Sequence, residues 1–204
     1  MKELPINTII QGDCLEVMKQ MPDKSVDLVL TDPPYGGILN KKSGHGSLKK
    51  SVKKYGDDDW DYKPKKEYFD EIFRISKNQI IFGGNYFIDY LYPTSCWIVW
   101  NKLNGATDFA DCELAWTSLN TAVRKFDKHS GDKDRFHPTQ KPLELFKWII
   151  ANYSEEGQTI LDPFLGSGTT AVACKHLKRN YIGIEISEKY CKIARQRLRQ
   201  ETLF

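Results

Sequence analysis

A carboxylate, two prolines and an aromatic ring follow an apolar run near the start of the chain. Residues 26–30 read Val-Asp-Leu-Val-Leu, and residues 31–36 read Thr-Asp-Pro-Pro-Tyr-Gly. Because proline fixes φ and lacks an N–H, this segment predicts a stiff corner rich in hydrogen-bond acceptors. Such a corner suits a planar base, since the Asp32 side chain and the Pro33 carbonyl can accept from an exocyclic amine while Tyr35 stacks on the ring. Taken alone, the tetrapeptide is also compatible with a strand that ends in a proline turn.

A glycine-rich turn follows another apolar run late in the chain. Residues 159–170 read Thr-Ile-Leu-Asp-Pro-Phe-Leu-Gly-Ser-Gly-Thr-Thr. Glycines allow a ligand to approach the backbone closely. The next predicted strand, 181–185, ends in Glu185, where nucleotide-binding βαβ units place a carboxylate for ribose hydroxyls. The spacing departs from G-x-G-x-x-G, which disfavours NAD, and an ordinary βαβ unit with a glycine turn would also fit.

Together and in this order, the two motifs resemble those of the β-class S-adenosylmethionine-dependent DNA amino-methyltransferases. Residues 32–35 resemble their catalytic motif, and the Phe-x-Gly-x-Gly run at 164–168 resembles their cofactor loop. The catalytic motif comes first, as in the permuted β-class order. Gly-Asp-Cys at 12–14 resembles the segment beside the cofactor adenine, and His-Pro-Thr-Gln-Lys-Pro at 137–142 resembles one that contacts the methionine end.

The resemblance, which covers nearly the whole chain, assigns roles to individual residues. The catalytic set is Asp32, Pro33, Pro34 and Tyr35. The set implied for S-adenosylmethionine is Asp13, Cys14, Thr139, Gln140, Lys141, Asp162, Phe164, Gly166, Ser167, Gly168, Thr169 and Glu185. Within it, Glu185 would bind the ribose hydroxyls, and residues 139–141 would lie near the carboxylate end. Asp13 would lie near the adenine, although aspartate is also common in turns.

The implied reaction is methyl transfer to an exocyclic amine. This amine is a weak nucleophile in adenine and cytosine because its lone pair is delocalised into the ring. Preorganised acceptors at Asp32 and Pro33 would stabilise the positive charge that the nitrogen gains in the transition state. The base cannot be reached inside a duplex, so it must be flipped out or already single-stranded.

Alternating strands and helices must position these residues. Strands are predicted at 8–12, 26–31, 79–84, 96–100, 113–117, 159–162 and 181–185, and helices at 14–21, 65–76, 143–152, 169–177 and 189–200. This alternation predicts an α/β domain over residues 1–204, with a mostly parallel sheet and helices on both faces. The closely spaced strands at 96–100 and 113–117 allow an antiparallel edge hairpin. The family's Rossmann-like fold, a seven-stranded sheet with one antiparallel strand, agrees with this expectation.

Charge is nearly balanced, with 30 basic and 27 acidic residues and a net charge of +3. DNA binding must therefore depend on local patches. Residues 36–66 lack periodicity and predict a long loop, which is commonly functional or disordered. The six lysines between residues 41 and 54 are candidates for phosphate contacts, namely Lys41, Lys42, Lys49, Lys50, Lys53 and Lys54. A solvated loop is the alternative.

The five cysteines form no C-x-x-C pair, so we expect reduced thiols and no metal site. No signal peptide or membrane-length apolar run is evident, which predicts a cytoplasmic protein with no membrane association. A prokaryotic or phage origin is expected from the resemblance.

The preferred function is N6-adenine methylation of DNA, since Asp32 occupies the first motif position as in the adenine enzymes. N4-cytosine methylation of DNA, adenine methylation of RNA, and a catalytically silent subunit of a heterodimer are the alternatives. Only residues 120–136 fill the place of the family's usual target-recognition segment. Recognition is therefore minimal, or lies in 36–66, or is shared with a second subunit. The resemblance also allows a homodimer.

Overall fold

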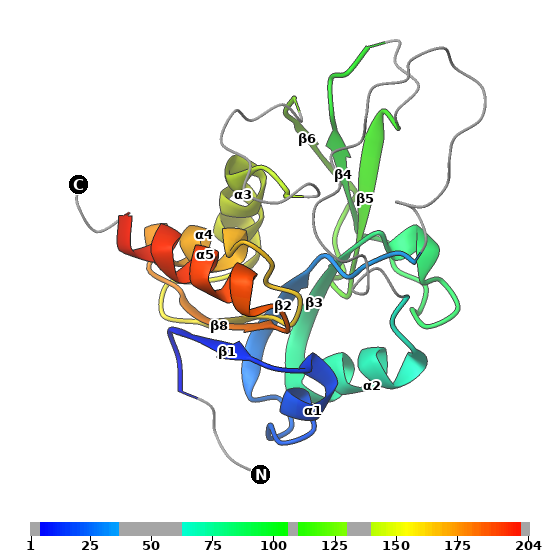
Figure 1. Ribbon diagram of the computed structural model, residues 1–204. Coiled ribbons are helices and arrows are strands. Elements are labelled where there is room, and N and C mark those ends of the chain that lie inside the picture. The colour runs from blue at the N-terminus through cyan, green and yellow to red at the C-terminus, as the bar shows by residue number, and fades with distance from the viewer. Residues whose placement is uncertain (1–4, 37–62, 106–109, 130–139, 201–204) are drawn as a thin grey trace.

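The computed structural model describes residues 5–36, 63–105, 110–129 and 140–200, and these form an eight-stranded sheet covered by helices (Figure 1). The strands are β1 (Thr8–Gln11), β2 (Val26–Thr31), β3 (Ser76–Phe82), β4 (Trp97–Asn101), β5 (Cys112–Thr117), β6 (Arg124–Asp127), β7 (Thr159–Asp162) and β8 (Asn180–Glu185). The helices are α1 (Cys14–Met18), α2 (Lys66–Ile75), the short 3-10 helix η1 (Gly84–Tyr86), α3 (Leu143–Tyr153), α4 (Thr169–His176) and α5 (Glu188–Gln200).

The sheet has the order β1-β8-β7-β2-β3-β5-β4-β6, and β5 alone runs antiparallel to its neighbours. The predicted fold class is confirmed, but the sheet has eight strands where seven were expected. The added strand is β6, which pairs in parallel with β4 within the stretch 120–136. An outermost strand needs only one paired side and little burial, so its Arg-Lys-Phe-Asp sequence lacks an apolar signature. Because β6 pairs outside β4, the β4–β5 hairpin, which was predicted at the edge of the sheet, lies one strand in from that edge.

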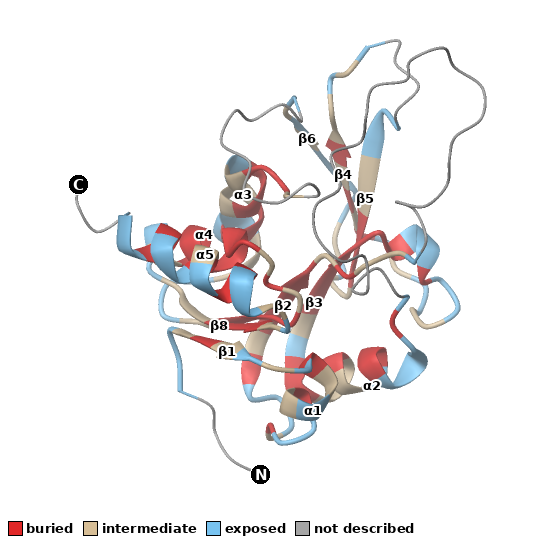
Figure 2. Cartoon of the chain, viewed as in Figure 1, coloured by how far each residue is buried: buried red, intermediate tan, exposed pale blue. Residues whose placement is uncertain are grey.

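Both faces of the sheet are buried, as expected for parallel strands between helices. On β2, Val29 packs with the face covered by α1 and α2, whereas Leu28 and Leu30 pack with the face covered by α3 and α4. Figure 2 shows this buried layer running along the central strands. None of the helices within the described residues is long and apolar enough to cross a membrane.

The carboxyl ends of four neighbouring strands carry the predicted site. In sheet order these strands are β1, β8, β7 and β2. Asp13 lies just beyond β1, Glu185 ends β8, Asp162 ends β7, and Asp32 follows β2. Ligands of open α/β sheets bind along this edge, so the topology gathers the two sequence motifs at one place.

Candidate functional site

Both carboxylate oxygens of Asp32 are already engaged by side chains. The Tyr35 hydroxyl donates to Asp32 Oδ1 at 2.7 Å. The Lys141 ammonium forms an ion pair with Asp32 Oδ2, and the Asp32 side chain retains 19% of its exposure. The corner therefore holds an oriented carboxylate that is still partly accessible.

Lys141 is a buried ammonium group, with a side chain only 7% exposed. Its Nζ also lies 3.1 Å from Glu113 Oε2, and 5.3 Å from the centroid of the Phe82 ring. Burial alone would lower the pKa of Lys141, but the charges of Asp32 and Glu113 outweigh it and leave the pKa raised. Lys141 therefore stays charged at neutral pH.

Glu113 was missed by the sequence reasoning. It lies on β5, and its Oε1 also forms an ion pair with Lys102 Nζ at a distance of 2.6 Å. Burial would raise the pKa of Glu113, but the charges of Lys141 and Lys102 lower it below its ordinary value. The available signal was a single acid in the otherwise uncharged strand Cys-Glu-Leu-Ala-Trp-Thr.

The Tyr35 ring is held by packing as well as by its hydroxyl. Tyr86, which follows β3 in η1, stacks on one face with centroids 4.8 Å apart and planes 22° apart. A Cβ built on Gly83 would lie 2.1 Å from the Tyr35 ring, so only glycine fits there. Burial, followed by the charge of Asp32, raises the pKa of Tyr35 well above its usual range. The Tyr35 phenol therefore remains protonated and donates to Asp32. The half-exposed Tyr86, which was not predicted from the sequence, covers part of the Tyr35 ring that was expected to stack on the base.

The glycine loop is shaped by its own backbone. Gly166 and Gly168 have φ values of +54° and +89°, which residues with a side chain rarely adopt. A Cβ at Gly168 would lie 2.7 Å from the Ala194 Cβ, whereas one at Gly166 would meet no atom within 4 Å. The loop therefore packs tightly against α5 on one side and is open at Gly166.

Glu185 fastens this loop to the end of β8. Its two carboxylate oxygens accept from the backbone N–H groups of Gly166 and Ser187, each at 2.8 Å. Burial raises the pKa of Glu185, and these backbone donors oppose the rise. Each oxygen retains a second lone pair, which leaves acceptors for ligand hydroxyls beside the open glycine.

Asp162 and Arg197 hold the loop from within. Asp162 accepts from the Phe164 N–H at 3.1 Å and from the Thr170 hydroxyl, and burial raises its pKa to about 7. Arg197 on α5 donates to the Ser167 carbonyl at 2.8 Å and contacts the Thr169 hydroxyl at 3.3 Å. In this structure the polar contacts of Asp162 thus point into the loop and α4.

Gln140 and Lys141 link the loop to the corner. Gln140 Oε1 accepts from the Ser167 hydroxyl at 3.0 Å, while its neighbour Lys141 reaches Asp32. The structure therefore brings the two sequence motifs together through residues predicted for the cofactor. Thr139 and the six lysines, Lys41, Lys42, Lys49, Lys50, Lys53 and Lys54, lie outside the described residues.

Asp13 is the N-cap of α1, where Oδ1 accepts from Leu15 N at 2.8 Å and from Glu16 N at 3.2 Å. Cys14 is buried, and burial raises the pKa of its thiol to about 12. The Gly12 N–H donates to the Glu185 carbonyl at 3.1 Å, so this segment lies beside the ribose candidate.

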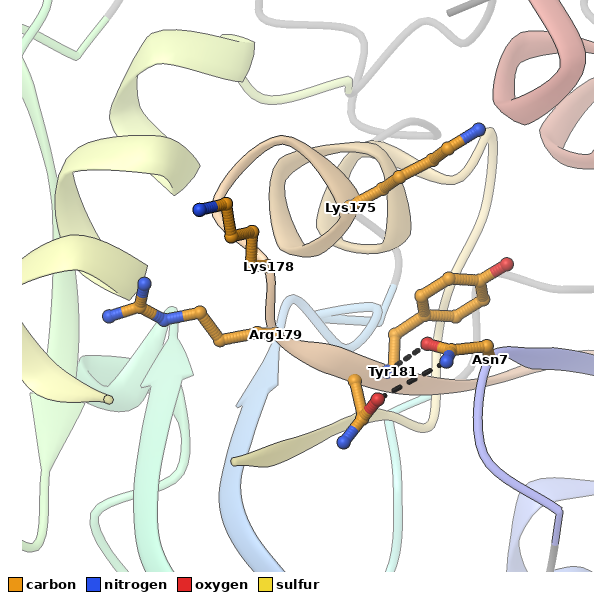
Figure 3. A pocket seen from close by; sticks show the side chains of 6 residues that line it. Asn7, Lys175, Lys178, Arg179 and Tyr181 are labelled. Atoms are coloured by element: carbon orange, nitrogen blue, oxygen red, sulfur yellow. Dashed lines mark hydrogen bonds between the residues drawn. The ribbon is translucent and has the colours of Figure 1, made fainter. Parts of the chain in front are cut away.

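A basic pocket lies at the opposite end of the sheet, where β8 begins (Figure 3). It is lined by Asn7, Lys175, Lys178, Arg179, Asn180 and Tyr181. Figure 3 shows the Lys175 and Arg179 side chains pointing apart, and both donate to backbone carbonyls. The pocket is therefore separate from the site above. Among the described residues, no group of three or more His, Cys, Asp or Glu is placed to hold a metal ion.

Comparison with known proteins agrees with this geometry. The DNA methylase family that comprises N6 and N4 enzymes matches residues 49–196. Type II methyltransferase M.HinfI of Haemophilus influenzae is 31% identical over 256 aligned residues, which cover 96% of this chain and 69% of the relative. Because that alignment is longer than the 204-residue chain, it includes insertions that this chain lacks.

Solved structures show the same fold. The complex of M1.HpyAVI with SAM superposes with a TM-score of 0.65 at 24% identity, covering 94% of this chain and 98% of that one. The cytosine-N4-specific PvuII DNA methyltransferase superposes with a TM-score of 0.63 at 16% identity, covering 93% and 85%. The resemblance to the S-adenosylmethionine-dependent DNA amino-methyltransferases is confirmed, and the chain belongs to the N6/N4 DNA methylase family.

Proposed function

We propose that this chain transfers a methyl group from S-adenosylmethionine to the N6 amine of adenine in DNA. The observation that carries the proposal is the oriented Asp32 carboxylate, which lies one strand away from the glycine loop and is linked to it through Gln140 and Lys141. A hydrogen-bond acceptor for an amine and an open glycine cradle are the two parts that such a reaction needs.

The glycine loop and Glu185 fit S-adenosylmethionine. The side of Gly166 that a side chain would fill is open, and the Glu185 carboxylate beside it has lone pairs for ribose hydroxyls. Asp13 and Cys14 would line the adenine end, and Phe164 would lie near the methionine end. When bound, S-adenosylmethionine supplies an activated methyl group that separates from its sulfur as the amine nitrogen bonds to the methyl carbon.

The corner would act on the amine. Asp32 and the Pro33 carbonyl would accept from its two N–H groups, which orients the nitrogen lone pair toward the methyl group. The nitrogen becomes positively charged as it forms the new bond, and the Asp32 carboxylate stabilises this charge where it develops. The nitrogen then loses one proton to water, which completes the transfer. Pro34 keeps the corner stiff, and Tyr35 orients Asp32 and contacts the base.

One residue, Asp32, is the basis for proposing adenine and not cytosine as the target base. Asp32 opens the motif, as in the adenine enzymes that the sequence resembles. The fold alone does not separate the two bases, because the cytosine-N4-specific PvuII enzyme shares it. RNA as substrate and a catalytically silent subunit remain alternatives that the product assay below distinguishes.

Target recognition is proposed to involve residues 36–66, of which 37–62 lie outside the described parts of the chain. The lysines there would contact phosphates, and M.HinfI carries insertions that this chain lacks. A second copy or another subunit would then supply further contacts. Replacing Lys49, Lys50, Lys53 and Lys54 by Ala should weaken DNA binding and reduce its salt dependence without changing cofactor affinity.

The product assay uses the full chain, S-adenosylmethionine and unmethylated genomic DNA, followed by digestion to nucleosides and mass spectrometry. We expect N6-methyldeoxyadenosine, and Asp32→Ala as a matched control should abolish it. N4-methyldeoxycytidine would replace the adenine proposal with the cytosine alternative. Cofactor binding without any methylated DNA would contradict the proposal, and a parallel RNA sample separates an RNA enzyme from a silent subunit.

A further inference from the structure

We propose that Lys141 and Glu113 form a charge-compensated pair that positions Asp32 for the target amine, so that Lys141 serves the acceptor and not the cofactor. Lys141 and Glu113 are positioning residues in this assignment, since both act through the Asp32 carboxylate. The inference rests on the proposed function and names how the same site is organised.

Four charges alternate in a row across the corner. Lys102 Nζ lies 2.6 Å from Glu113 Oε1, and Glu113 Oε2 lies 3.1 Å from Lys141 Nζ. Lys141 Nζ in turn is paired with Asp32 Oδ2. Lys102 directly follows β4, Glu113 lies on β5, Lys141 precedes α3, and Asp32 follows β2. Separate regions of the chain therefore converge on one carboxylate.

Burial makes this arrangement costly unless it is complete. The side chains of Lys102, Glu113 and Lys141 are only 16%, 25% and 7% exposed. Removing ions from water carries a large desolvation penalty, which close opposite charges offset. The Phe82 and Tyr35 rings, with centroids 5.3 and 6.0 Å from Lys141 Nζ, leave the ammonium little room to move. A lysine held this way has little freedom to reach a separate ligand.

The pair resolves a conflict in the chemistry at Asp32. A lysine that orients the carboxylate also cancels the negative charge that must stabilise a positively charged amine. Glu113 compensates the charge of Lys141 and leaves its orienting contact in place. The amine then meets an aligned acceptor whose negative charge is not fully cancelled, which favours the transition state over the ground state.

The test measures single-turnover methyl transfer to DNA at saturating S-adenosylmethionine, with cofactor affinity measured by calorimetry on the same full-length variants. Lys141→Met should reduce the rate by at least about tenfold and Glu113→Gln by about fivefold, with cofactor affinity changed by less than about twofold. The control is Lys77→Met, which removes an ion pair with Asp27 at the opposite end of β2 and β3 and should leave both quantities unchanged.

Two further variants separate charge from shape. Glu113→Asp keeps the charge and shortens the side chain, so it should retain more activity than Glu113→Gln, which keeps the shape. A merely structural role for Glu113 predicts the reverse order. In the Lys141→Met background, Glu113→Gln should add little further loss, because Glu113 acts through Lys141. If Lys141→Met does not fold, the comparison of Glu113→Asp with Glu113→Gln still decides the proposal.

Besides that reversed order, three further results would overturn the inference. Lys141→Met could weaken cofactor binding tenfold or more with a normal saturated rate, which would return Lys141 to the cofactor. Glu113→Gln could retain the full single-turnover rate. Alternatively, the double variant could lose rate by the product of the two single-variant losses, which would mean that Glu113 acts independently of Lys141. Failure of the unmodified chain to methylate DNA would instead reject the proposed function, and this inference with it.

Discussion

The Asp32 corner and the glycine loop lie at the ends of neighbouring strands β2 and β7, yet they are held in place by different forces. The corner depends on charged side chains brought from distant parts of the sequence, such as Lys141, which is 109 residues from Asp32. The loop depends on positive φ at two glycines and on hydrogen bonds that the Glu185, Asp162 and Arg197 side chains make within it, with no ion pair among the described residues there. Substitutions in the corner should therefore change the charge around Asp32 and the rate of methyl transfer. Substitutions in the loop should change the backbone shape and the affinity for S-adenosylmethionine.

The largest expected effect is at Asp32. Asp32→Ala should lower the single-turnover rate about 100- to 1000-fold, as typical for loss of one preorganised charge-stabilising group. Tyr35→Phe removes only the 2.7 Å bond to Asp32 Oδ1, so its loss should not exceed about tenfold. Rapid-quench transfer of labelled methyl measures both rates. Equal losses in the two variants would show that the carboxylate itself is not the principal group.

The next effect concerns the packed side of the loop. Gly168→Ala should destabilise the fold by about 2–4 kcal/mol, because it combines a φ of +89° with overlap against Ala194. Gly157→Ala is the matched control, since Gly157 has a φ of +82° but open surroundings. Its cost should be about 1 kcal/mol. Denaturant unfolding measures the difference, and equal costs would mean that the contact with α5 contributes nothing.

A smaller effect is expected on the open side of the loop. Gly166→Ala places a methyl group where nothing lies within 4 Å, so the folded chain should lose about 1 kcal/mol through its positive φ. The same methyl group would occupy the proposed cofactor space and weaken S-adenosylmethionine binding about tenfold. Calorimetric titration checks this, with Gly157→Ala as the control that should bind normally. Unchanged affinity in Gly166→Ala would move the cofactor away from this glycine.

The smallest effect is a pH dependence of stability. Burial raises the pKa of Asp162 to about 7, well above its value in an unfolded chain. Between those values the unfolded chain has released this proton and the folded chain retains it, so stability from this group falls as pH rises and levels off above about 7. From pH 6 to pH 8 the fall should be about 1 kcal/mol.

The variant Asp162→Asn isolates this contribution, because Asn keeps an acceptor for the Phe164 N–H and cannot ionise. The difference in unfolding free energy between pH 6 and pH 8 should be smaller in the variant by about 1 kcal/mol. An identical pH dependence in both proteins would show that Asp162 does not titrate in this range.

The same contrast explains what the sequence could predict. Strand β2 and the glycine loop follow from local patterns, namely an apolar run, two prolines and a Gly-Ser-Gly turn, and the structure has β2 at the residues predicted for it. The partners of Asp32 are long-range, so nothing near Asp32 indicated Lys141 or Glu113. Lys141 was identified by resemblance, but its contact with Asp32 was not expected. Strand β6 was missed because an exposed outer strand has no apolar alternation to detect.

The assignment of catalysis to the corner and of cofactor binding to the loop is tested most directly by one experiment on two variants. The single-turnover rate is measured against S-adenosylmethionine concentration for Asp32→Asn and Glu185→Gln side by side. Asp32→Asn should lower the saturated rate severely and leave the half-saturating cofactor concentration unchanged. Glu185→Gln should raise that concentration about tenfold and largely preserve the saturated rate. The account is contradicted if Asp32→Asn loses its activity through weaker cofactor binding, or if both variants change rate and affinity alike.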